Sequence, residues 1–243
     1  HSQTQDDLIT TEGSPEPNKL PKGAIAMDPN YPVPDAPMAK AHMLDEWINF
    51  SATSEESMRL AAETAQKALT LDASDPRVYN ALTNLYIMQR QYEKAIDAAE
   101  HRLELSPSGA HAYNSMGLAL NFAGRHSEAI PFIEQAIRLD PYPPGVTFRT
   151  LADAYSNVGR YKEAITEYKK ALQQNPDDIF AHLDLADTYM KLGLEVEARA
   201  EAKEVIRIHP KFSLSHFVKN LQHLEQSTVD DFTKSLRKAG LPE

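Results

Sequence analysis

The sequence predicts an all-α fold, an α-solenoid built from stacked helical hairpins. Apolar residues recur at helical spacing along most of the 243 residues. Prolines at positions 107, 141, 176 and 210 follow one another at intervals of 34, 35 and 34 residues. A unit of this length cannot bury its apolar face alone, so each unit needs neighbours in a stack.

The clearest unit is residues 145–178, GVTFRTLADAYSNVGRYKEAITEYKKALQQNPDD. Tyr155 belongs to the apolar face of a first helix, and Gly159 permits the left-handed backbone that ends this helix. Ala164 is a small residue of a second helix, where it allows close helix packing. Pro176 then stops the second helix and turns the chain into the next unit.

The remaining elements follow from similar signals. Ser54 is an N-cap candidate for a helix to about Leu71, the second half of a divergent hairpin that contains Trp47. We expect one helix from Ser213 to about Gln226 and a shorter helix over 229–239. The predicted organisation is a polar, proline-rich arm (1–35), the divergent hairpin (36–75), four regular units (76–109, 110–144, 145–178 and 179–212) and C-terminal capping helices (213–243).

The proline spacing and the recurring small and aromatic residues resemble the tetratricopeptide repeat over about residues 76–212, with a weaker extension to about 36. This resemblance implies a right-handed superhelix that binds protein segments and is not an enzyme. A narrower resemblance, carried by AETAQKALTLDASDP, HPKFSLSHF and LRKAGLPE, is to the C-terminal repeat region of bacterial class III adenylate/guanylate cyclase-like proteins. This resemblance implies a regulatory or docking module, and it does not imply catalytic activity.

Composition narrows the classes of partner. The formal net charge is −10, and no run of basic residues is longer than Lys169-Lys170, so nucleic-acid binding is not expected. No apolar run approaches the roughly 20 residues of a membrane-spanning helix, so membrane insertion is not expected either. The chain begins at His1. A cytoplasmic location is favoured, while a periplasmic or exported location stays open if a signal peptide was removed before His1.

Catalytic and metal-binding patterns are weak. The chain has no Cys and nine His, without H-E-x-x-H, G-x-S-x-G or a phosphate-binding glycine loop. The helical pairs His42/Glu46 and His216/His223 supply two ligands each, too few for a metal site. We therefore expect no catalytic residue, no metal and no cofactor, and we expect His182 to be a packing residue.

The first helix of each hairpin should line the concave groove of the superhelix. Phasing these helices on their core positions gives the candidate ligand-binding residues. They are Asn80, Asn84, Met88, His111, Asn114, Leu118, Asn121, Phe122, Arg149, Asp153, Asn157, Asp184 and Asp187.

Asparagine amides both donate and accept hydrogen bonds, which suits the backbone of an extended peptide. Keeping the inner surface soluble explains the same residues equally well. Asp153, Asp184 and Asp187 make the C-terminal half of the groove acidic, so that it should accept a basic or neutral ligand.

The leading hypothesis is a non-enzymatic scaffold that binds a peptide or protein segment in its concave groove. The alternative is a regulatory or self-association module of a signalling enzyme such as a nucleotide cyclase. The identity of the partner and the formation of a homo-oligomer stay open at this point.

Overall fold

The computed structural model describes residues 54–221 and 226–243, and every regular element within these ranges is helical. The elements are α3 (Ser54–Leu71), α4 (Pro76–Met88), α5 (Tyr92–Leu105), α6 (Ala110–Phe122), α7 (His126–Leu139), α8 (Gly145–Asn157), α9 (Tyr161–Gln174), α10 (Ile179–Lys191), α11 (Glu195–Ile208), α12 (Leu214–Val218), the 3-10 helix η1 (Lys219–Leu221) and α13 (Gln226–Ala239).

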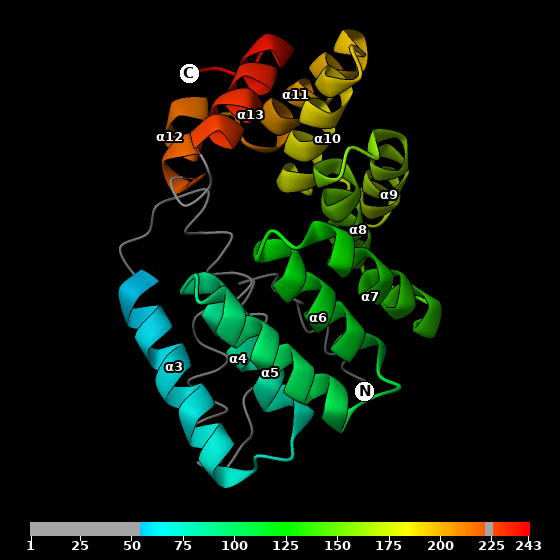
Figure 1. Cartoon of the computed structure of the whole chain (residues 1–243). Coiled ribbons are helices and arrows are strands. Elements are labelled where there is room, and N and C mark those ends of the chain that lie inside the picture. Colours follow the sequence, from blue (N-terminus) through cyan, green and yellow to red (C-terminus); the bar gives the residue numbers. More distant parts are fainter. Residues whose placement is uncertain (1–53, 222–225) are drawn as a thin grey trace, which may run out of the picture.

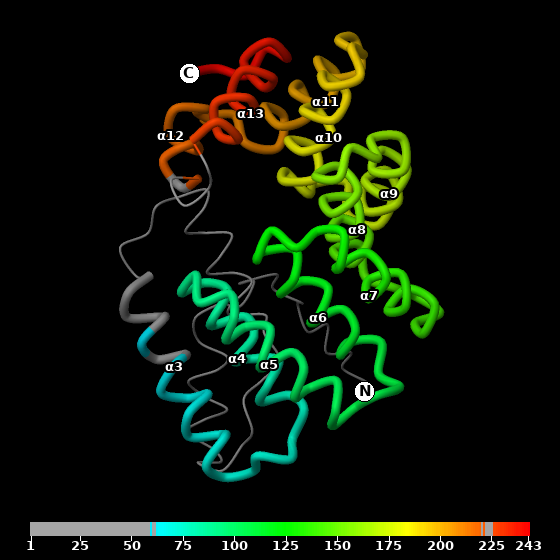
Figure 2. The backbone as a smooth tube through the Cα atoms, in the orientation of Figure 1, coloured from blue at the N-terminus to red at the C-terminus, as the bar shows by residue number. Residues whose placement is uncertain are grey.

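Successive helices pack into antiparallel pairs, which stack into a curved array (Figure 1). The pairs are α4 with α5, α6 with α7, α8 with α9, and α10 with α11, and each second helix also contacts the first helix of the next pair. The backbone trace winds from α3 through these pairs to α12 and α13 (Figure 2). The prediction of an all-α solenoid is therefore confirmed.

The two helices of a hairpin approach closely where small residues face large ones. A Cβ atom on Gly117 of α6 would lie 2.3 Å from Cγ1 of Ile133 on α7, closer than two carbon atoms can pack. Ala152 of α8 and Ala164 of α9 have no exposed surface. The two helices of a hairpin can thus come close only because these positions carry glycine or alanine.

The turns inside the hairpins require a left-handed residue. Gly124, Gly159 and Gly193 have φ values of 75°, 79° and 75°. A Cβ atom at these positions would meet nothing within 4 Å, so backbone conformation and not space selects glycine. The α4–α5 turn places Arg90 in the same region, at φ 59°.

The C-terminal end differs from the prediction. The expected helix from Ser213 to about Gln226 stops as α12 and η1, because the N–H of Lys219 bonds the His216 carbonyl in 3-10 fashion. The second helix, α13, begins at Gln226 and not at Val229. It packs against α10 and α11, and the N–H of Leu214 donates to the Pro242 carbonyl at 2.8 Å.

Aromatic contacts fix this end of the array. The Phe217 ring of α12 lies 6.4 Å from Phe180, 5.7 Å from Phe212 and 6.5 Å from Phe232, measured between ring centroids. Leu214 and Leu221 are buried beside it. The C-terminal helices therefore cover the apolar surface at the end of α10 and α11, as solenoids require.

Some sequence predictions fall outside the described residues. These are the arm over 1–35, the first half of the divergent hairpin with Trp47, and the His42/Glu46 and His216/His223 pairs, each of which has at least one such member. None of the helices in the described ranges is long and apolar enough to cross a membrane. Those ranges also contain no group of three or more His, Asp or Glu side chains arranged to hold a metal ion.

His182 is buried in α10, where it does more than fill space. Its Nδ1 lies 2.6 Å from Oε2 of Glu201 on α11, and its Nε2 lies 3.0 Å from the Pro176 carbonyl oxygen. Both neighbours are acceptors, so both ring nitrogens must donate and the imidazole is charged. Burial lowers the pKa of His182, but these two hydrogen bonds and the charges of Glu201 and Glu204 together raise it above its usual value.

We predict that Arg90→Gly raises the free energy of unfolding by about 1 kcal/mol, because glycine adopts the left-handed conformation without steric conflict. Gly159→Ala at the equivalent turn should lower the free energy of unfolding by a similar amount. Urea denaturation of the two variants and the wild type measures both effects. Loss of stability in Arg90→Gly would show that the Arg90 side chain, not its backbone, governs the turn.

We predict that His182→Gln destabilises the protein by roughly 1–3 kcal/mol at pH 5.5 or so, where the charged hydrogen bonds are fully present. Because the pKa of His182 is raised in the folded state, this stabilisation is present below the unfolded value of about 6.5 and disappears as the pH rises through the folded value. Denaturation over a pH series measures the difference, with His111→Gln on the exposed surface of α6 as control. A difference that is constant up to about pH 9 would contradict the charged state.

Candidate functional site

The first helices of the four hairpins form one continuous surface, which we call the first-helix face. It consists of α4, α6, α8 and α10, and each contacts the next helix of this set. Of the candidate residues on it, His111 and Asn157 are exposed and Asp187 is buried. The others are half-buried: Asn80, Asn84, Met88, Asn114, Leu118, Asn121, Phe122, Arg149, Asp153 and Asp184. Asp187 thus differs from the expected open position.

Asn80 is part of a network between hairpins. Nη1 of Arg102 on α5 donates to Oδ1 of Asn80 on α4 and, at 2.5 Å, to the Ser115 hydroxyl of α6. Arg102 is only 9% exposed, and a buried cation needs such acceptors. The Asn80 carbonyl therefore stabilises the α4–α5–α6 junction.

Asn121 has a similar structural role at the next junction, where α6 meets α7 and α8. Its Nδ2 donates to the Thr150 carbonyl of α8 at 3.2 Å, and its Oδ1 accepts from Nδ1 of His126 on α7 at 2.6 Å. Burial lowers the pKa of His126 and so favours the neutral ring. Both polar groups of the Asn121 amide are thus engaged within the protein.

Asn84 and Asn114 differ from these two. Within the described part of the chain, neither side-chain amide takes part in a hydrogen bond, and Oδ1 of Asn114 is enclosed without a donor. An enclosed polar atom without a partner lowers the stability of the folded state. Met88, Leu118 and Phe122 add half-buried apolar surface to the same helices. This part of the first-helix face combines available amides with apolar side chains.

The other half of the face carries a group of acidic residues, Asp153, Asp178, Asp184 and Asp187, which we call the carboxylate cluster. Arg149 bridges two of them, with Nη1 at 3.8 Å from Asp153 Oδ2 and Nε at 3.2 Å from Asp178 Oδ2. Asp187 Oδ2 pairs with Lys191 Nζ at 2.8 Å.

Asp153 and Asp184 form the centre of the cluster. Burial raises the pKa of Asp184 well above its usual range, and the neighbouring Asp153 raises it further. Burial also raises the pKa of Asp153, although Arg149 opposes this effect. Both carboxyl groups therefore lose their protons less readily than carboxyl groups in water do.

Two members of this site were not among the sequence-predicted residues. The Tyr168 hydroxyl of α9 donates to Asp153 Oδ1 at 2.7 Å, whereas the sequence places Tyr168 at a core position and gives no signal of this contact. Asp178 caps α10 by accepting from the N–H groups of Phe180 and Ala181. An Asp before an apolar helical run is a recognisable cap, but its pairing with Arg149 is not visible in the sequence.

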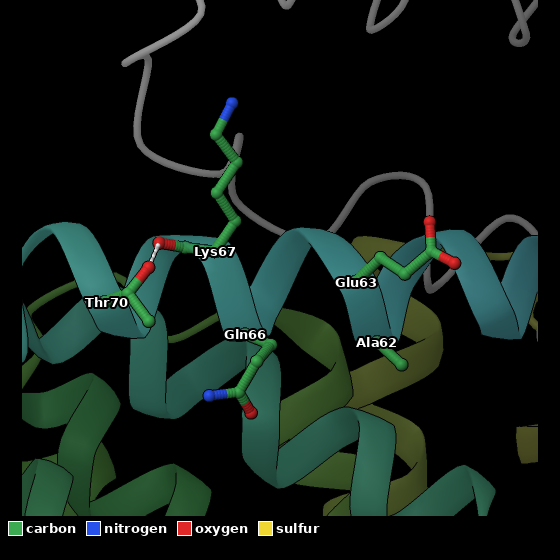
Figure 3. Close-up of a pocket in the computed structure, with 5 residues that line it drawn as sticks. All are labelled: Ala62, Glu63, Gln66, Lys67 and Thr70. Atoms are coloured by element: carbon green, nitrogen blue, oxygen red, sulfur yellow. Dashed lines mark hydrogen bonds between the residues drawn. The ribbon is translucent and has the colours of Figure 1, made fainter.

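A hollow on α3 is a weaker candidate site. It is lined by Ala62, Glu63, Gln66, Lys67 and Thr70 (Figure 3). All of these residues belong to one helix, and the Thr70 hydroxyl donates to the Lys67 carbonyl of its own turn at 2.7 Å. The hollow brings together no residues from different hairpins, so the first-helix face is the stronger candidate site.

Comparison with known proteins supports the repeat architecture. Residues 110–143 match the family model described as tetratricopeptide repeat, and residues 152–193 match a model described as TPR repeat. Small glutamine-rich tetratricopeptide repeat-containing protein 2 of Mycosarcoma maydis is 30% identical over 95 residues, 39% of this chain and 27% of that protein. The peroxisomal targeting signal receptor of Kluyveromyces lactis is 29% identical over 119 residues, 49% of this chain and 21% of that protein.

The chain therefore spans about a quarter of the length of these curated relatives. Neither of the two is a nucleotide cyclase, so the resemblance to cyclase-like proteins stays a prediction.

Solved structures share the fold. PilW, described as a widely conserved type IV pilus biogenesis factor, matches with a TM-score of 0.62 and 17% identity over 83% of this chain and 88% of its own. YrrB, described as a TPR protein with an unusual peptide-binding site, matches with a TM-score of 0.50 and 19% identity over 83% of this chain and 97% of its own. At these identities the likeness concerns the fold alone.

The family matches and the fold lead to the same assignment. Both matched models describe the same kind of repeat. Residues 110–143 and 152–193 match tetratricopeptide repeat models, and they lie within a helical solenoid whose fold is similar to that of PilW.

Proposed function

We propose that this protein holds an extended segment of a partner protein along the first-helix face, which forms the concave groove of the solenoid. The observation that carries the proposal is the contrast among the asparagines of this face. Asn80 and Asn121 are engaged between hairpins, whereas the amides of Asn84 and Asn114 have no hydrogen-bond partner among the described residues.

An extended peptide presents alternating N–H and C=O groups, and an asparagine amide can accept from the first and donate to the second. Asn84 and Asn114 lie on neighbouring helices that contact each other, so one extended segment can reach both. Leu118 and Phe122 supply apolar contacts next to them, as in other peptide-binding surfaces.

The engaged amides favour binding in a second way. The hydrogen bonds of Asn80 and Asn121 hold α4, α6 and α8 in register before any ligand arrives. A preformed surface loses little conformational freedom on binding, which benefits affinity.

We predict that Asn84→Ala combined with Asn114→Ala weakens peptide binding roughly 5- to 100-fold, because two hydrogen bonds are lost. The probe is a peptide selected from a random library on the intact chain, and its dissociation constant is measured by fluorescence anisotropy. The variant should unfold at the same or a higher temperature than the wild type, because neither amide bonds to another described residue and the enclosed Oδ1 of Asn114 is removed.

The matched control is Asn80→Ala combined with Asn121→Ala, which removes the same number of amides from the same face. Its main effect should be a lower melting temperature, because it breaks the contacts to Arg102 and to the Thr150 carbonyl. If all selected peptides bind the Asn84/Asn114 variant as tightly as the wild type, the groove is not the binding site.

A further inference from the structure

The exposed large apolar side chains of the described ranges form two groups at opposite edges of the solenoid. The first group lies where second helices end and the chain passes to the next hairpin, and it consists of Leu71, Leu105, Leu139 and Tyr142. The second group surrounds the turn between α10 and α11, and it consists of Leu192, Leu194 and Val196. Because the helices of a hairpin are antiparallel, turns within hairpins lie at one edge of the array and connections between hairpins lie at the other.

The second group, which we call the apolar turn, differs from the turn of the preceding hairpin. Counted from the left-handed glycine of each turn, Leu194 takes the place of Arg160, and Val196 takes the place of Lys162. Val196 is 76% exposed, so it contributes little to the core of its own chain. The third hairpin folds with charged residues at these two positions. Folding therefore does not explain why the fourth hairpin exposes apolar side chains there.

Tyr142 is the most exposed member of the first group, yet its backbone is fixed. Its side chain is 90% exposed. Its N–H donates to Oδ1 of Asp140 at 2.9 Å, and the Pro143 carbonyl accepts from Nε2 of Gln174 on α9 at 2.9 Å. Prolines at positions 141, 143 and 144 restrict the backbone further. A tyrosine on a rigid loop loses little conformational freedom on binding, and tyrosine is enriched among the residues that dominate protein interfaces.

The charges at the two edges differ in sign. The connections between hairpins, residues 72–75, 106–109, 140–144 and 175–178, contain several Asp and no Lys, Arg or His. The turns within hairpins, residues 89–91, 123–125, 158–160 and 192–194, contain Arg at three of the four turns and no acidic residue. Some of these groups pair within the chain, as Arg125 does with Glu128. Contact between two like edges would still bring like charges together, whereas contact between unlike edges would not.

We infer that copies of this chain associate head to tail, with Leu139 and Tyr142 of one copy packed on the apolar turn of the next copy. This contact removes both apolar surfaces from water, which a single copy cannot do because the two surfaces lie at opposite edges. A contact between two different surfaces adds copies in a row unless a ring closes. The first-helix face takes no part in the contact, so the inference does not depend on the proposed function.

The association should be weak and reversible, because only a few side chains take part on each side. The formal net charge of −10 also opposes the approach of two copies. Salt at about 0.15 M screens charges that are more than roughly 8 Å apart, so this repulsion should not prevent the contact under such conditions.

Sedimentation velocity of the intact chain over roughly 10 to 500 μM should show an average mass that rises with concentration. Tyr142→Ser should raise the dissociation constant roughly tenfold or more. Leu194→Arg combined with Val196→Lys should have the same effect. This double variant should keep its fold, since the third hairpin carries Arg and Lys at the equivalent positions. The matched control is Leu71→Ser, which removes an exposed apolar side chain from the same edge but from α3, and it should leave the association unchanged.

A mixture of the two variants tests the head-to-tail arrangement. Tyr142→Ser keeps the apolar turn, and the Leu194/Val196 variant keeps Tyr142. Each variant alone should stay monomeric, whereas the mixture should form 1:1 dimers and nothing larger. Self-association of the Leu194/Val196 variant alone would show that like edges pair, and it would overturn the inference.

The inference is also overturned if the wild type stays monomeric over the whole concentration range. Equal weakening by Leu71→Ser and Tyr142→Ser would overturn it as well, because the association would then be unspecific. Failure of the proposed function has a different signature, since the binding of selected peptides depends on Asn84 and Asn114 and can be measured on the monomeric Tyr142→Ser variant.

Discussion

The close contact between the two helices of each hairpin is the constraint on which the rest of the structure depends. Ala95, Ala129, Ala164 and Ala198 occupy the same place in successive second helices, and none of them has exposed surface. A larger side chain there would separate the helices and change the angle at which the next hairpin stacks. The helices α4, α6, α8 and α10 thus line up on one face because the second helix of each hairpin carries a small alanine at the contact.

The helices could be predicted from the spacing of apolar residues and from the positions of small residues. Both signals come from residues that are close together in the chain. The end of α12 could not be predicted in this way, since Phe217 packs against Phe180 of α10, which is close in space but not in the sequence. The roles of the asparagines were hidden for the same reason. Asn80 and Asn121 look like Asn84 and Asn114 in the sequence, and only partners on other helices, such as Arg102, separate the two pairs.

The first-helix face is chemically asymmetric along the solenoid axis. Amides and apolar side chains occupy the part formed by α4 and α6, whereas carboxyl groups occupy the part formed by α8 and α10. A segment bound along the whole face would meet neutral groups at one end and acidic groups at the other.

The turn at Arg90 bears on how repeats of this kind are counted in genomes. Its backbone has the left-handed geometry of the turns at Gly124, Gly159 and Gly193, yet it carries no glycine. The residues matched by family models begin at Ala110, after this turn, although α4 and α5 pack as the later hairpins do. In this chain the matched residues therefore cover fewer hairpins than the structure contains among its described residues.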